Sequence, residues 1–159
     1  MPNKWTFTIK PIAELLNSLV KGEWADPFAG NNSPAKYTND LNPNARSQSH
    51  LDAVEFLKSF SADSLDGILL DPPYSLHQVT ISYNGYGDKR VIALTPVYDE
   101  IARVVHYGGL CISFGWNSNG LGKRRGFEID EIYLIAHGGH HNDTIVTVER
   151  KITSKLLGQ

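Results

Sequence analysis

The sequence predicts an α/β domain of three layers, in which helices cover both faces of a mostly parallel β-sheet that ends in an antiparallel hairpin. Two observations predict this class. Apolar segments of strand length alternate along the chain with segments whose apolar residues recur at helical spacing. The last two strand-like segments follow each other, joined by a glycine-containing turn. The 159 residues suit a single domain, residues 1–159, with a tail at 152–159.

The elements are expected in this order: helix 9–22, strand 24–28, a glycine turn at 28–35 with a helical turn after it, strand 36–38, helix 49–60, strand 64–70, loop 75–91, helix 95–109, strand 110–116, loop 117–126, and strands 127–137 and 141–151. Ser49 and Thr95 are expected to cap the second and third helices, and Gly108-Gly109 to end the third. Residues 67–70 are all small or apolar, as in a strand buried on both faces.

Composition excludes several classes of protein. The formal net charge of −2 and the pI of about 6.3 exclude a chain that binds nucleic acid by bulk charge alone. The single cysteine, Cys111, permits neither an intrachain disulfide nor a cysteine zinc cluster, and it is expected to be inert core. We expect no metal at His137, His140 and His141, no membrane span and no signal peptide, and therefore a cytoplasmic protein.

Polar residues follow each predicted parallel strand at the point where it ends. Asp26, Asp40 and Asp71 follow the first three strands, and Trp116-Asn117 follow the fourth. Because the carboxyl ends of parallel strands meet at one edge of a sheet, a ligand is expected there. The carboxylate after the second strand, Asp40, is suited to holding a ribose diol, since a carboxylate accepts two hydroxyl hydrogens.

Two segments together resemble a known family. Residues 26–33 read DPFAGNNS and residues 71–74 read DPPY, and this pair resembles the signature of the S-adenosylmethionine-dependent amino-methyltransferases that act on DNA. The resemblance extends to residues 7–11, to 50–53 and to 104–114, and so covers residues 7 to 150. It implies a Rossmann-like methyltransferase fold, with S-adenosylmethionine as cofactor and S-adenosylhomocysteine as product.

The resemblance implies a set of cofactor-binding residues, namely Thr8, Lys10, Pro11, Asp26, Pro27, Phe28, Gly30, Asn32, Ser33, Asp40, Asp52 and Ala53. Asn32 stands where the family often has a second glycine, and Asn tolerates left-handed backbone better than most residues. Ordinary structural roles are the alternatives: a turn cap for Asp26, an Asx-turn for Asp40 and a helix-start acid for Asp52.

The tetrapeptide Asp71, Pro72, Pro73 and Tyr74 is the expected catalytic group. The exocyclic amine of adenine is a poor nucleophile because its lone pair is delocalised into the ring. Two acceptors aimed at its two hydrogens, the Asp71 carboxylate and the Pro72 carbonyl, favour the tetrahedral geometry that attack requires. Tyr74 offers a face for stacking of a flipped base. The alternative is a tight Pro-Pro turn with no catalytic role.

Substrate contacts are expected from residues in the two loops, namely Ser75, His77, Trp116, Asn117, Lys123, Arg124 and Arg125. Trp116 could equally belong to the core, and the basic residues could be solvated loop charges. The chain is too short to include a separate target-recognition domain. Sequence specificity is therefore expected to be low, to be supplied by a partner, or to come from the loops 75–90 and 117–125. A homo-oligomer would extend the substrate-binding surface, and the small free-standing form resembles phage enzymes.

Several functions remain open at this point. An Asp before the Pro-Pro pair favours a DNA adenine-N6 methyltransferase over a cytosine-N4 enzyme, since the latter more often carries Ser there. RNA and protein-glutamine methyltransferases carry a similar tetrapeptide with Asn. A non-catalytic subunit that keeps the fold is the alternative from a different class, and it should bind the cofactor weakly or not at all.

Overall fold

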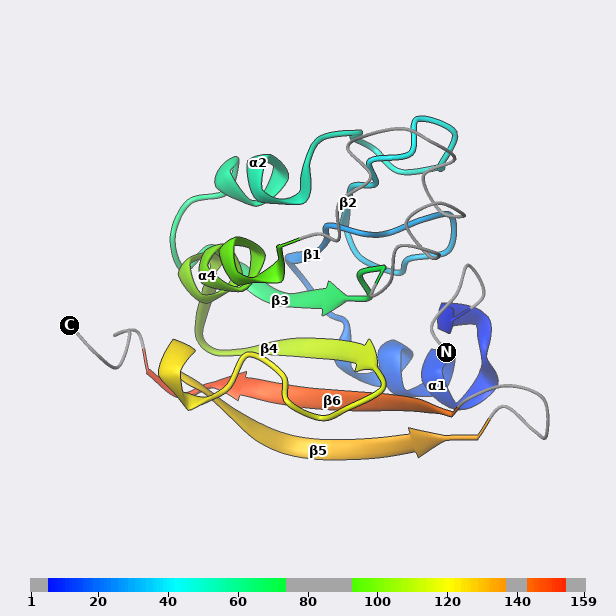
Figure 1. Cartoon of the computed structure of the whole chain (residues 1–159), viewed down its shortest axis with the longest axis vertical. Helices are drawn as coiled ribbons and strands as arrows, with labels where there is room; N and C mark the ends of the chain where they lie inside the picture. Colours follow the sequence, from blue (N-terminus) through cyan, green and yellow to red (C-terminus); the bar gives the residue numbers. More distant parts are fainter. Residues whose placement is uncertain (1–5, 74–92, 137–142, 154–159) are drawn as a thin grey trace.

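The computed structural model describes residues 6–73, 93–136 and 143–153 (Figure 1). Its elements are η1 Thr6–Thr8, α1 Lys10–Leu19, β1 Trp24–Asp26, β2 Tyr37–Thr38, α2 Ala53–Lys58, β3 Leu65–Leu70, α4 Leu94–Val104, β4 Val105–Gly115, η2 Lys123–Arg125, β5 Phe127–Ile135 and β6 Thr144–Lys151. The six strands form one sheet in the order β2-β1-β3-β4-β6-β5. Strand β6 is antiparallel to both of its neighbours, and the other pairings are parallel. The predicted fold class is confirmed.

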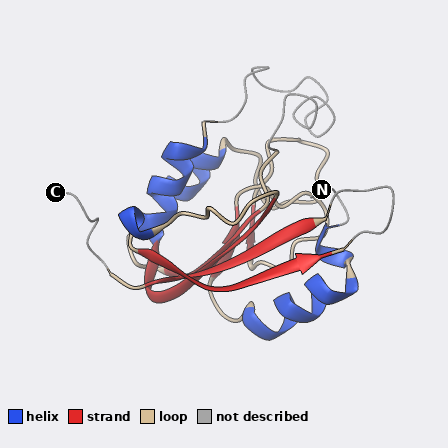
Figure 2. Ribbon diagram, turned by 60° about the horizontal axis from the view of Figure 1, so that its bottom comes forward, coloured by secondary structure: helices blue, strands red, loops and turns tan. Residues whose placement is uncertain are grey.

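The sheet is covered on both faces (Figure 2). On one face, Ile68, Leu70 and Cys111 pack in a cluster with residues of α2 and α4. On the other, Leu69 and Ile112 pack with residues of α1. Successive residues of β3 thus pack on opposite faces of the sheet, which explains why Ile68, Leu69 and Leu70 are all apolar. Full burial of one such Leu or Ile side chain contributes about 1.5–3 kcal/mol.

The predicted end of the third helix is wrong. Helix α4 ends at Val104, and residues 105–109 begin β4 instead of completing a helix that stops at Gly108-Gly109. Gly109 lets β4 approach β3, because a Cβ there would lie 2.8 Å from the backbone oxygen of Asp66. The buried ammonium of Lys151 donates to the carbonyl oxygens of Ala102 and Val105, at 2.8 and 2.5 Å, and so caps the helix end.

Three other local predictions are also wrong. Between β1 and β2, residues 27–36 form turns and irregular backbone, with no helix among them. Helix α2 is shorter than expected, and its N-cap is Asp52 in place of Ser49: the Asp52 carboxylate accepts from the backbone N–H of Val54 at 2.9 Å. Helix α4 begins at Leu94 after Ala93, so Thr95 lies inside its first turn. The expected loop 75–91 and the turn at 138–141 lie outside the described residues.

In the described part of the chain, no helix combines the length and the apolar character needed to span a bilayer.

Candidate active site

The carboxyl ends of β1 and β3 lie side by side at one edge of the sheet (Figure 1). The two strands pair in parallel, with Ala25 opposite Ile68. Asp26 is the last residue of β1, and Asp71 directly follows the last residue of β3. The structure therefore brings together the two carboxylates that begin the two sequence motifs.

Asp26 is completely buried. Its Oδ1 accepts from the backbone N–H of Phe28 at 2.9 Å, and its Oδ2 accepts from the hydroxyl of Ser33 at 2.6 Å. Burial raises the pKa of the Asp26 carboxyl to about 7 in spite of these two hydrogen bonds, and nearby Asp40 adds to the rise. A carboxyl that changes charge near neutral pH is therefore located at this strand end.

Asp71 is half-buried, but its Oδ1 is fully buried and has no hydrogen-bond partner among the residues that the structure describes. Burial, and secondly the charge of Asp26, raise the pKa of Asp71 well above its usual range, while the side chain of Thr6 on η1 opposes the rise. An unpartnered buried acceptor costs about 1–3 kcal/mol and calls for a functional explanation.

Asp40 organises the glycine turn. Its two carboxylate oxygens accept from the backbone N–H groups of Gly30 and Asn42, at 2.9 and 2.8 Å. The bond to Asn42 is the expected Asx-turn, but a carboxylate has lone pairs for further donors. Gly30 has a φ of +53°, and a Cβ placed there would have no atom within 4 Å, so the turn leaves open space at this point.

The residue that connects these turns is Asn39, which sequence reasoning did not select as a site residue. Its side-chain amide donates to the carbonyl oxygens of Pro27 and Leu51, and its Oδ1 accepts from Ser49 and from the N–H of Leu51. Asn39 is completely buried, and its four bonds go to three residues in the turns around the candidate site. Only its position directly after a strand could have indicated it.

Replacing Asn39 with leucine is expected to destabilise the protein by at least about 3 kcal/mol, because it leaves several buried backbone and hydroxyl groups unpaired. Chemical denaturation measures the change. Asn17→Ala is the matched control, since Asn17 is exposed on α1 and its loss should change stability by less than about 0.5 kcal/mol. Similar values for the two variants would contradict the role assigned to Asn39.

The remaining predicted cofactor residues surround the same edge. Pro27 and Phe28 are buried, Asn32 is exposed, and Ala53 begins α2. In the N-terminal segment, Thr8 and Lys10 are exposed, and Pro11 lies in the first turn of α1. The ring of Phe7 packs edge-on against that of Phe114 at 5.2 Å, which fixes this segment beside the carboxyl end of β4.

The predicted substrate residues are divided between the two ends of the sheet. Trp116 and Asn117 follow β4 at the edge that carries Asp71, and Trp116 is 47% exposed. Tyr74, Ser75 and His77 lie outside the described residues. Lys123, Arg124 and Arg125 form η2 at the opposite end of the sheet, where β4 begins (Figure 1).

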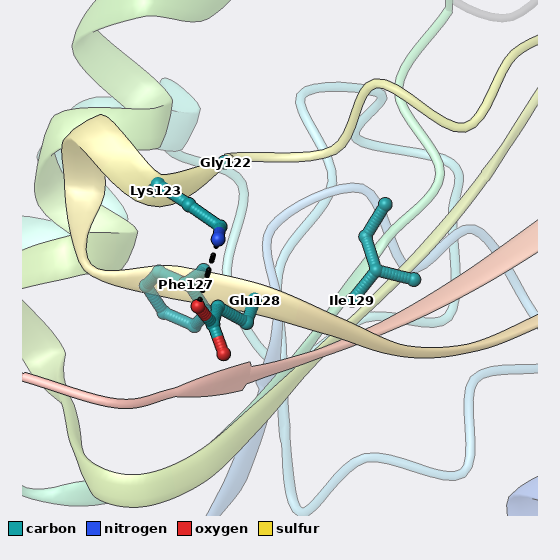
Figure 3. Close-up of a pocket in the computed structure, with 5 residues that line it drawn as sticks. All are labelled: Gly122, Lys123, Phe127, Glu128 and Ile129. Atoms are coloured by element: carbon teal, nitrogen blue, oxygen red, sulfur yellow. Dashed lines mark ion pairs between the residues drawn. The ribbon is translucent and has the colours of Figure 1, made fainter.

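Hydrogen bonds and an ion pair hold η2 and the loop before it at this end of the sheet. The backbone N–H groups of Leu121 and Gly122 donate to the buried carboxylate of Glu149, which attaches the preceding loop to β6. Lys123 pairs with Glu128 at 3.1 Å beside an open hollow of about 370 Å³, which Gly122, Phe127 and Ile129 also line (Figure 3). The structure does not bring these basic residues together with Asp71.

No triad of His, Cys, Asp or Glu within residues 6–73, 93–136 and 143–153 is arranged to hold a metal ion. His137, His140 and His141 lie outside these ranges.

Comparisons with known proteins identify the fold of the chain but do not assign it to a family. No family model matches the chain, and no curated protein matches it by sequence. TrmN from Thermus thermophilus superposes with a TM-score of 0.57 at 18% identity, over 90% of this chain and 48% of its own. The N-methyltransferase NodS from Bradyrhizobium japonicum gives 0.56 at 12% identity, over 92% and 97%. An S-adenosylmethionine-dependent methyltransferase from Methanosarcina mazei gives 0.56 at 10%, over 87% and 97%.

The chain therefore has the Rossmann-like fold of methyltransferases. It spans about half the length of TrmN.

Proposed function

We infer that the protein is an S-adenosylmethionine-dependent methyltransferase that acts on an exocyclic amine of DNA, with adenine N6 as its target. The observation that supports this inference most directly is the buried Oδ1 of Asp71 at the end of β3, which has no hydrogen-bond partner in the described part of the chain. A substrate amine would supply the hydrogen that this acceptor lacks. The fold, in which ligands bind at the carboxyl edge of the sheet, gives general support.

The residues at this edge fit the cofactor. Asp40 and the backbone of the glycine turn would hold its ribose and methionine parts, because the turn is open at Gly30 and Asp40 retains free lone pairs. Asp26 and Asp71 place two carboxylates close together, and among the described residues no Lys or Arg acts appreciably on either pKa. The ionised form of such a pair is favoured beside a positive charge, and the cofactor's sulfonium, which supplies the methyl group, carries one.

Asp71 then acts as the principal acceptor for the substrate amine. Its Oδ1 and the carbonyl oxygen of Pro72 would accept the two amine hydrogens and favour the tetrahedral nitrogen that attacks the methyl carbon. The N–CH₃ bond would form as the S–CH₃ bond breaks, S-adenosylhomocysteine would leave, and the proton lost by the nitrogen would pass to solvent. Acceptors placed in advance lower the barrier because they need no reorganisation at the moment of reaction.

Nucleoside mass spectrometry tests the function. The purified protein is incubated with unmethylated DNA and methyl-labelled S-adenosylmethionine, and the digested DNA is examined for labelled nucleosides. Labelled N6-methyladenine is the expected product. Labelled N4-methylcytosine would keep the mechanism and correct the base. An unlabelled DNA together with measurable cofactor binding would contradict the DNA substrate and direct the search to RNA or protein.

A further inference from the structure

Strand β5 forms one edge of the sheet, and three of its apolar side chains are exposed (Figure 1). Ile129, Ile132 and Leu134 are 45%, 53% and 68% exposed. Among the described residues, β5 pairs with β6 alone, so its outer backbone groups have no strand beside them. An exposed apolar edge strand is a template for pairing with another strand, and proteins usually protect such an edge.

Only the first half of β5 carries such protection. Its register with β6 shifts between Ile129 and Glu131, and a shift of this kind bends a strand and interrupts further pairing. Glu128, Asp130 and Glu131 place charged side chains in the same half. Residues 132–135 read Ile-Tyr-Leu-Ile, stay in regular register with β6 and carry no charge. The second half of β5 is therefore the part of this edge that is open to another strand.

We propose that residues 131–135 of β5 pair with the same residues of a second copy of this chain, antiparallel and about a twofold axis at Tyr133. The sheet of one copy then continues into the sheet of the other. Side chains two residues apart on a strand point to the same face, so Ile132 lies beside Leu134 of the partner subunit on one face of the joined sheet. The symmetry repeats this apolar pair, and such cross-strand pairs stabilise a sheet.

The charges of β5 favour this occupant and this orientation. In the antiparallel pairing, Glu131 lies opposite Ile135 of the partner subunit. Four residues, or about 13 Å along the strand, separate the two Glu131 carboxylates, which is more than the Debye length of about 8 Å at physiological ionic strength. A parallel pairing in register would place Glu128, Asp130 and Glu131 opposite their own counterparts, where like charges are destabilising. A segment that matches itself about its centre is what a twofold contact requires, whereas a foreign strand imposes no such match.

Sedimentation velocity at about 1 to 500 µM protein tests the proposal, because self-association raises the average mass with concentration. Five residues from each copy make a contact smaller than the roughly 800 Å² per partner of stable complexes, so a dissociation constant of about 10–100 µM is expected. Leu134→Lys places a charge in the contact and should raise this constant at least about 10-fold. Tyr107→Lys is the matched control and should leave it unchanged, because Tyr107 is 69% exposed but lies near the start of β4.

Cysteine cross-linking tests the register of the pairing. The two copies of Tyr133 would lie opposite each other with Cα atoms about 4.5–5.5 Å apart, a distance that a disulfide bridges. Oxidised glutathione should therefore convert Tyr133→Cys to a covalent dimer and leave Glu128→Cys monomeric, and the native Cys111 is buried. Equal cross-linking of these two variants, or equal association of Leu134→Lys and Tyr107→Lys, would overturn the proposal. A wild type that stays monomeric at every concentration would also overturn it and leave the edge to a foreign strand.

Discussion

Asp71→Ala is expected to reduce methyl transfer by at least about 10²-fold while cofactor binding is retained. The substitution removes the acceptor oxygen for which residues 6–73, 93–136 and 143–153 offer no partner, and loss of one preorganised group at a reacting centre has an effect of about this size. Single-turnover transfer from labelled S-adenosylmethionine, at saturating cofactor, measures the rate. Isothermal titration calorimetry measures the binding.

Two further variants test whether the effect is specific to the carboxylate of Asp71. Asp71→Asn keeps an oxygen acceptor and loses only the charge, so its rate should lie between those of the wild type and Asp71→Ala. Asp66→Asn changes a carboxyl near the other end of the same strand, where it pairs with His106, and should leave transfer unchanged. A wild-type rate in Asp71→Ala would contradict the role given to the tetrapeptide.

Asp26→Asn is expected to stabilise the cofactor-free protein at high pH, by up to roughly 4 kcal/mol above pH 7. In the unfolded chain the carboxyl ionises near its ordinary pKa of 3.8, whereas in the folded protein it ionises only near 7. Between these values the folded state holds more protons, so wild-type stability falls as pH rises from about 4 to about 7. Asparagine cannot ionise and removes this loss. It can keep the bond from the N–H of Phe28 and can donate to the hydroxyl of Ser33.

Thermal unfolding at pH 5 and pH 8 measures this effect as a difference in Tm between variant and wild type that grows with pH. Asp99→Asn serves as the control, because Asp99 is exposed and its surface pair with Arg125 contributes little. An equal difference at both pH values would show that Asp26 is ionised throughout. The same substitution should weaken cofactor binding, because it removes a negative charge beside the proposed position of the cofactor. Charged residues of binding sites often lower stability while they serve function.

The sequence predicted the architecture well because its signals are local. The apolar residues of β3, the helical spacing in α1 and the carboxylates at the strand ends each depend on a few neighbouring residues. Since the carboxyl ends of parallel strands share one edge, these local signals were enough to place Asp26 near Asp71. The cofactor and catalytic roles of these residues remain predictions.

Details that depend on distant residues could not be predicted in this way. The end of α4 is set by Lys151, which lies 46 residues beyond Val105, and by the approach of β4 to β3 at Gly109. The role of Asn39 depends on bonds to turns 10 to 12 residues away in both directions. The basic residues of η2 lie away from Asp71 because Glu149 binds the loop before them.

The order β4-β6-β5 has a consequence for biosynthesis. A ribosome releases the chain from its N-terminus, so β4 and β5 are both made before the strand that lies between them. Until residues 144–151 emerge, β4 and β5 each lack the strand that joins them, and both offer open edges to other nascent chains. The same late segment brings Glu149 and Lys151, which fasten the loop before η2 and the end of α4. Completion of this half of the sheet therefore waits for the last strand to be translated.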